Sequence, residues 1–223
     1  MKEIQIENRR CFLWGEPTAP IRLIQMTDET DLQGMQEEVE LLKHGKHDFC
    51  LYAVPVFHWN KDLSPWAAPP AFGKEPFGSG ASDTLRFLLT GLIPAADTQS
   101  SGVYVLGGYS LAGLFALWAG YETDRFAGIA AASPSVWFPD WDTYAKANGM
   151  RANAVYLSLG NREEKTRNVS MACVADRIRA QETLLTQQGI SCVLEWNEGN
   201  HFTDPAKRTA RAFSWVMDQM KGH

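Results

Sequence analysis

The sequence has no long hydrophobic run and no large excess of one charge. Its 223 residues include 21 basic and 26 acidic side chains, which gives a formal net charge of −5. The two signs are interspersed, and this argues against a nucleic-acid partner or a membrane surface. No stretch is apolar enough to span a bilayer, and the charged N-terminal residues lack the apolar core of a signal peptide. We therefore expect a cytoplasmic protein.

Cysteines are few and widely separated, at Cys11, Cys50, Cys173 and Cys192. They form no CxxC pair, and no histidines stand at ligand spacing, so we expect neither a metal site nor a cofactor. In a cytosolic chain the four are expected to be free thiols, mostly buried. A linker rich in proline, glycine and serine is also missing, as is any internal repeat. The length therefore predicts one domain over residues 1–223.

Strand-like apolar runs alternate with helix-like segments along the whole chain. Strands are expected at Ile4–Ile6, Cys11–Trp14, Ile21–Met26, Phe49–Val56, Val103–Leu106, Phe126–Ala132, Ala154–Leu159 and Cys192–Trp196. Helices are expected after the N-caps Asp31, Ser82 and Asp204 and from Val169 to Gln188, the first ending at Gly45 and the second at Pro94. This alternation predicts an α/β fold: a mostly parallel central sheet of about eight strands with helices on both faces and no large lid domain.

The most informative segment is 102–119, which reads GVYVLGGYSLAGLFALWA. A strand, a glycine pair and a helix follow one another, with Ser110 at the turn, as in the nucleophile elbow of α/β-hydrolases. Ala112 replaces the second glycine of the usual G-x-S-x-G pattern. An elbow here would expose Ser110 Oγ and direct the Leu111 backbone N–H toward an oxyanion. Ser110 is therefore the predicted nucleophile, and an incidental serine in an ordinary strand–turn–helix is the alternative.

A serine nucleophile needs a histidine base, and in the α/β-hydrolase order the acid and then the histidine follow the serine. His201 lies in the loop between the last expected strand and the last expected helix, where this order places the base. The remaining histidines lie at a polar helix end, before the serine or at the terminus (His44, His47, His58 and His223). His201 is therefore the predicted base.

The acid is expected in the turn after the strand that ends near residue 159. Glu163 is our first choice there and Glu164 the second. Only one of the two can be the acid, because adjacent carboxylates cannot both reach one imidazole. A solvated polar loop is the alternative interpretation of this charged turn. Asp140 and Asp142 follow the preceding strand, which is an occasional position for the acid.

Other site residues leave a weaker trace in the sequence. No HGGG run is present, so the Thr27 backbone N–H, after the third strand, is our choice for the second oxyanion donor. Aromatic side chains near the expected strand ends are pocket candidates: Trp59, Trp66, Trp137 and Tyr109. An equally good interpretation is that the tryptophans cover the hydrophobic rim of the domain.

Several motifs together resemble the family of esterase D and the enterobactin-type esterases. These are GYSLAG around the serine, SPSVW at 133–137, GNREE at 160–164, GNHF at 199–202 and, in some bacterial members, the loop Asp62–Phe72. The resemblance covers most of the chain in the right order. It implies an α/β-hydrolase fold with Ser110 as nucleophile, His201 as base and Glu163 as acid. Siderophore lactones, formylglutathione, feruloyl esters and acyl transfer all occur in this family, so no substrate is implied.

We therefore expect a serine hydrolase that cleaves carboxylic esters through an acyl-enzyme, with a small-molecule ester as its partner. The protein is expected to be a monomer or homodimer. An acyltransferase or thioesterase with the same triad is the first alternative. A non-catalytic binding protein on the hydrolase scaffold is the second.

Overall fold

The computed structural model describes residues 1–71, 73–98 and 101–220, so Phe72 and His223 lie outside the described part. Within these residues, strands form one sheet in the order β1-β2-β4-β3-β5-β6-β7-β8. Their bounds are β1 Lys2–Ile6, β2 Arg9–Trp14, β3 Ile21–Thr27, β4 Phe49–Pro55, β5 Val103–Tyr109, β6 Gly128–Ala132, β7 Ala154–Gly160 and β8 Ser191–Asn197. β2 pairs antiparallel with β1 and β4, and the other pairs are parallel. The mostly parallel sheet expected from the sequence is confirmed.

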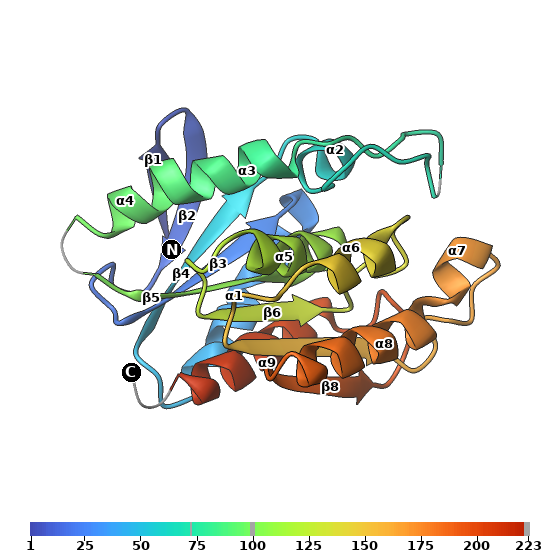
Figure 1. Cartoon of the computed structure of the whole chain (residues 1–223). Coiled ribbons are helices and arrows are strands. Elements are labelled where there is room, and N and C mark those ends of the chain that lie inside the picture. Colours follow the sequence, from blue (N-terminus) through green and yellow to red (C-terminus); the bar gives the residue numbers. More distant parts are fainter. Residues whose placement is uncertain (72, 99–100, 221–223) are drawn as a thin grey trace.

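Helices cover both faces of this sheet (Figure 1). Their bounds are α1 Glu29–Lys43, α2 Trp59–Asp62, α3 Ala81–Phe87, the π-helical turn η1 Leu88–Leu92, α4 Ile93–Ala96, α5 Leu111–Glu122, α6 Trp141–Ala147, α7 Val169–Ala172, α8 Val174–Gln187 and α9 Pro205–Gln219. α1 and α9 share one core with one face of the sheet, whereas α3, α5 and α8 share a second core with the other. None of the helices described is both long and apolar enough to cross a membrane.

The central strands are buried on both faces, as parallel strands between two helix layers must be. Every residue of β6 and β7 is buried. α9 approaches β5 closely because Gly107 has no side chain: a Cβ there would lie 2.6 Å from the Phe213 ring. This close packing brings the N-terminal turns of α9 to the carboxyl ends of the strands.

Two predicted helix starts are wrong by a few residues. Asp28, not Asp31, is the N-cap of α1, and the two form a reciprocal capping box. The Asp31 N–H donates to the Asp28 carboxylate at 2.7 Å, and the Asp28 N–H donates to the Asp31 carboxylate at 3.3 Å. α3 begins at Ala81 after Gly80, so Ser82 lies inside the helix and does not cap it.

Two predicted helix ends also differ. Pro94 does not end its helix, because the π-turn η1 lets the chain continue into α4, whose first turn contains the proline. The helix expected from Val169 to Gln188 is divided at Cys173 into α7 and α8. The expectation of free cysteines holds for the described residues, but only Cys11 and Cys50 are buried, and the other two are half-buried.

Candidate active site

Ser110 occupies the sharp turn between β5 and α5. Its backbone φ of 58° and ψ of −121° lie in a region that side-chain-bearing residues rarely adopt. The end of β6 and the loop after it hold this conformation: the Ser110 N–H donates to Ala132 O at 3.1 Å, and the Ser135 N–H donates to Ser110 O at 3.1 Å. The turn therefore has the strained geometry of a nucleophile elbow.

The elbow tolerates Ala112 because Gly108 has no side chain. A Cβ on Gly108 would lie only 2.6 Å from Ala112 Cβ. Gly113 is less confined, because a Cβ there would lie 3.2 Å from Pro134 Cα. The elbow thus accommodates alanine in place of the second glycine of the G-x-S-x-G pattern, because the residue two before the serine is a glycine without a side chain.

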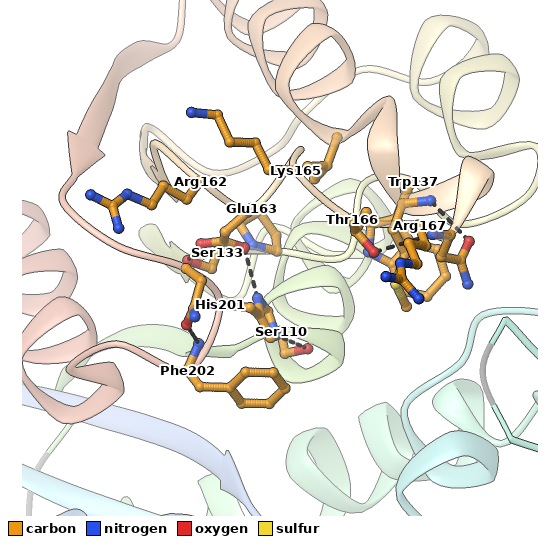
Figure 2. Close-up of a pocket in the computed structure, with 15 residues that line it drawn as sticks. Ser110, Ser133, Trp137, Arg162, Glu163, Lys165, Thr166, Arg167, His201 and Phe202 are labelled. Carbon is orange, nitrogen blue, oxygen red and sulfur yellow. Dashed lines mark hydrogen bonds and ion pairs between the residues drawn. The ribbon is translucent and has the colours of Figure 1, made fainter.

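Ser110, His201 and Glu163 form a continuous hydrogen-bonded chain (Figure 2). His201 Nε2 lies 3.0 Å from Ser110 Oγ, and His201 Nδ1 lies 2.7 Å from Glu163 Oε2. With Nδ1–H donating to the carboxylate, Nε2 is the acceptor that faces the serine hydroxyl. The Glu163 side chain is 5% exposed and that of His201 is 31% exposed, so the acid is shielded while the imidazole is open to the cavity.

Three donors surround the other oxygen of Glu163. Oε1 accepts from the Gly160 N–H at 2.7 Å, Ser133 Oγ at 2.8 Å and Arg208 Nη1 at 2.9 Å. Burial raises the pKa of Glu163, but hydrogen bonds from His201, Gly160 and Ser133 outweigh it and hold the pKa below its usual value. The carboxylate is therefore the stable form of this side chain.

The other acids considered lie elsewhere. Glu164 is exposed, and Asp142 forms an ion pair with Arg177 at 2.8 Å. Asp140 precedes α6 in a left-handed conformation with φ of 62°. Among these carboxylates, the structure places only that of Glu163 against the His201 ring.

The two predicted oxyanion donors differ in position. Leu111 is the first residue of α5, so its N–H has no acceptor within the helix. Thr27 is the last residue of β3 and is fully buried, outside the lining of the cavity beside Ser110. The neighbouring Asp28 N–H is occupied by the capping box. The role of the Thr27 N–H stays a prediction.

A cavity of about 760 Å³ opens beside Ser110. Its apolar lining includes Trp137, Met171, Val174 and Phe202. Its polar lining includes the cations Arg162, Lys165 and Arg167, and none of them forms an ion pair with a described carboxylate. The site therefore combines an apolar wall with an excess of positive charge. Figure 2 shows that the side chains of Arg162 and Lys165 extend away from Ser110.

Of the predicted pocket aromatics, Trp137 lines this cavity, whereas Trp59, Trp66 and Tyr109 do not. The Trp66 indole N–H donates to Pro139 O at 3.0 Å, and the ring packs against Phe138 and Tyr144. The buried Tyr109 hydroxyl donates to His201 O at 2.7 Å. Trp66 thus packs half-buried against the core, and Tyr109 supports the histidine loop.

Arg208 is a site residue that the sequence analysis missed. It lies on α9 with 2% exposure and contacts Glu163 directly. Its only sequence signal is its position: Arg208, Ala212 and Val216 recur at helical spacing, so the arginine stands on the buried face of an amphipathic helix. A buried arginine on such a face requires a partner.

Comparisons with known proteins give structural neighbours only. No family model and no curated protein matches the sequence. An IroE-like serine hydrolase from Shewanella oneidensis superposes with a TM-score of 0.78 at 17% identity, over 96% of this chain and 77% of that one. Siderophore hydrolase EstA from Aspergillus nidulans gives 0.73 at 18% identity, over 96% and 90%. Enterobactin esterase FES from Shigella flexneri gives 0.69 at 14% identity, over 98% and 59%.

These neighbours confirm the α/β-hydrolase fold. Their names also agree with the esterase resemblance of the sequence motifs.

Proposed function

We propose that the protein is a serine hydrolase that cleaves carboxylic esters through an acyl-enzyme. The observation that carries this proposal is the continuous chain from Ser110 Oγ through His201 to Glu163, with contacts of 3.0 and 2.7 Å. A nucleophile, a base and an orienting acid in hydrogen-bond contact are the arrangement that acyl transfer requires. The elbow conformation of Ser110 is independent support.

In the proposed first half-reaction, Ser110 Oγ attacks the ester carbonyl carbon while its proton passes to His201 Nε2. The carbonyl oxygen becomes an oxyanion, which the Leu111 N–H at the start of α5 stabilises, with the Thr27 N–H as second donor. Collapse of this intermediate breaks the bond to the leaving oxygen, which takes the proton from His201. Glu163 remains ionised throughout and stabilises the imidazolium.

In the second half-reaction, water attacks the acyl-enzyme carbonyl and gives its proton to His201. The carboxylic acid leaves, and Ser110 recovers its proton. An acyltransferase or thioesterase would share the acyl-enzyme, with an alcohol or thiol as the acceptor or the leaving group. Analysis of products formed with and without added alcohols and thiols separates these activities.

The cavity lining favours an ester that bears negative charge. The cations Arg162, Lys165 and Arg167 outnumber the one carboxylate of the described lining, although the whole chain carries a net charge of −5. Local positive charge attracts anionic substrates and raises their association rate. Trp137 and Phe202 offer aromatic surface in the same cavity. Because EstA is named a siderophore hydrolase and FES an enterobactin esterase, ester siderophores are the first natural substrates to assay.

A fluorophosphonate probe tests the proposal, because it labels activated serines. We expect labelling of the wild type at Ser110 and no labelling of Ser110→Ala. Turnover of p-nitrophenyl acetate should fall on the order of 10⁴-fold or more in that variant. Ser82→Ala, at an exposed position of α3, is the matched control and should behave as wild type. Retained turnover in Ser110→Ala would overturn the proposal, and absence of labelling in folded wild type would favour a binding protein.

A further inference from the structure

We propose that Arg208 is a positioning residue that fixes the elbow, the acid and the histidine loop in one arrangement through a single buried guanidinium group. The inference rests on the proposed function, because it assigns a role within the same triad.

The Nη1 end of Arg208 reaches the acid and the elbow. It donates to Glu163 Oε1 at 2.9 Å and to the Tyr109 hydroxyl oxygen at 3.0 Å. Tyr109 immediately precedes Ser110 in the chain. Ser133 Oγ, 3.3 Å from the same nitrogen, also donates to Glu163. One nitrogen therefore contacts groups from β5, from the loop after β6 and from the turn after β7.

The Nη2 end reaches the histidine loop. It donates to Glu198 O at 2.9 Å and to Asn200 O at 3.1 Å. His201 follows directly, and its own carbonyl accepts from the Tyr109 hydroxyl at 2.7 Å. Arg208 thus holds the backbone on the N-terminal side of His201 directly, and through Tyr109 it also holds the carbonyl of His201 itself.

Only arginine has the shape for these contacts. Its planar guanidinium presents several N–H donors in a rigid fork, whereas the lysine ammonium is a single compact charge. The acceptors lie on segments as far apart in sequence as Tyr109 and Asn200, and the fork joins them from its two ends. A lysine at this position would keep the positive charge but lose some of these hydrogen bonds.

The charge of Arg208 acts on the proton transfer as well. A cation at 2.9 Å from Glu163 favours the carboxylate and disfavours a second positive charge on His201. Loss of the cation should therefore ease protonation of the base and move the acid limb of the pH–rate profile to higher pH. A residue with only a structural role would leave this limb in place.

Arg208 does not line the cavity beside Ser110. Its removal should therefore lower kcat more than it changes KM. Misplacement of a reacting group by about 1 Å costs on the order of 10²-fold in rate, and we expect a loss of that size in Arg208→Met.

The test compares Arg208→Met, Arg208→Lys and Arg211→Met with the wild type. Arg211 lies on the same helix and pairs with Glu195 at 2.8 Å, away from the triad, so Arg211→Met is the matched control. Kinetics across pH are normalised to sites titrated by a fluorophosphonate, which removes the effect of unfolded protein. We expect Arg208→Met to lose kcat and shift the acid limb, Arg208→Lys to lose kcat with little shift, and Arg211→Met to change neither.

Wild-type kcat per titrated site in Arg208→Met would overturn the proposal, and so would a loss of kcat with an unmoved acid limb. If Arg208→Met does not fold, Arg208→Lys decides, because wild-type kcat in that variant would contradict the need for the fork. Retained activity in Ser110→Ala would instead overturn the proposed function, so the two failures are distinguishable.

Discussion

Gly108 and Ala112 share a space that holds a single Cβ atom. The Ala112 methyl group fills it, and a Cβ on Gly108 would lie 2.6 Å away, closer than two such carbons can approach. The pair therefore sets the separation between the end of β5 and the first turn of α5, and with it the position of Ser110.

Gly108→Ala should disrupt the elbow, because the added methyl must push α5 away from β5. We expect a loss of activity together with a lower melting temperature, since overpacking typically costs about 1–3 kcal/mol. Ala112→Gly removes a methyl from the same space and should keep most of the activity. Activity in Gly108→Ala equal to wild type would contradict this account.

Glu163→Gln should lower kcat sharply. An amide cannot stabilise the imidazolium, and it leaves the buried Arg208 without its carboxylate partner. A loss on the order of 10⁴-fold is expected from the comparable change in serine proteases. The control is Glu164→Gln at the adjacent exposed position, which should retain wild-type kcat. A loss of kcat in Glu164→Gln, with wild-type kcat in Glu163→Gln, would show that Glu164 is the acid.

Anionic esters should be hydrolysed more efficiently than neutral esters of the same size. The advantage in kcat/KM should fall as salt is added, because salt screens exposed charges. Arg167→Gln should reduce the advantage, whereas Lys2→Gln, on the edge strand β1, should not. Equal kcat/KM for the two ester types at low salt would refute the charge argument.

Glu38 should make the fold less stable as the pH rises. Burial raises its pKa from 4.5 to about 8, and the hydrogen bond from Gln25 Nε2 at 3.1 Å opposes this rise. The unfolded state therefore loses its proton first, and stability falls between pH 4.5 and about 8, by about 1.4 kcal/mol for each pKa unit. Above about pH 8 Glu38 is ionised in both the folded and the unfolded state, so it causes no further loss of stability.

Glu38→Gln removes this titration, so its advantage over wild type in the free energy of unfolding should grow across the same window. Urea unfolding at several pH values measures it. Glu37→Gln, at an exposed position one residue before, is the control and should follow the wild type. A pH-independent difference between Glu38→Gln and wild type would show that Glu38 is ionised in the folded state.

The sequence predicted most of the strands, because the apolar runs that identify buried strands are local patterns. Chain order pointed to His201, which the structure brings within 3.0 Å of Ser110 Oγ, while its role as the base stays a prediction. The prediction of Asp31 as the N-cap is wrong because Asp31 stands three residues after Asp28, and either carboxylate suits a helix start. The prediction that Pro94 ends its helix is wrong because a π-turn has no clear local signature.

Arg208 escaped prediction for a different reason. Its contacts join residues from 109 to 208, and no local pattern records a contact between such distant segments. Trp66 illustrates the same limit: it was expected in the pocket, but it packs against Phe138 and Tyr144, and such contacts depend on the tertiary fold.

The division of the expected long helix at Cys173 leaves most of the cavity wall that follows Glu163 outside the helix that supports the sheet, since Val174 is the one α8 residue in the described lining. α7 buries none of its side chains, whereas α8 buries several against β7 and β8. We therefore expect the stretch between β7 and α8 that follows Glu163 to accept changes in length and composition, in nature or by design, that suit a different ester while the core and the residues around Ser110 stay as they are.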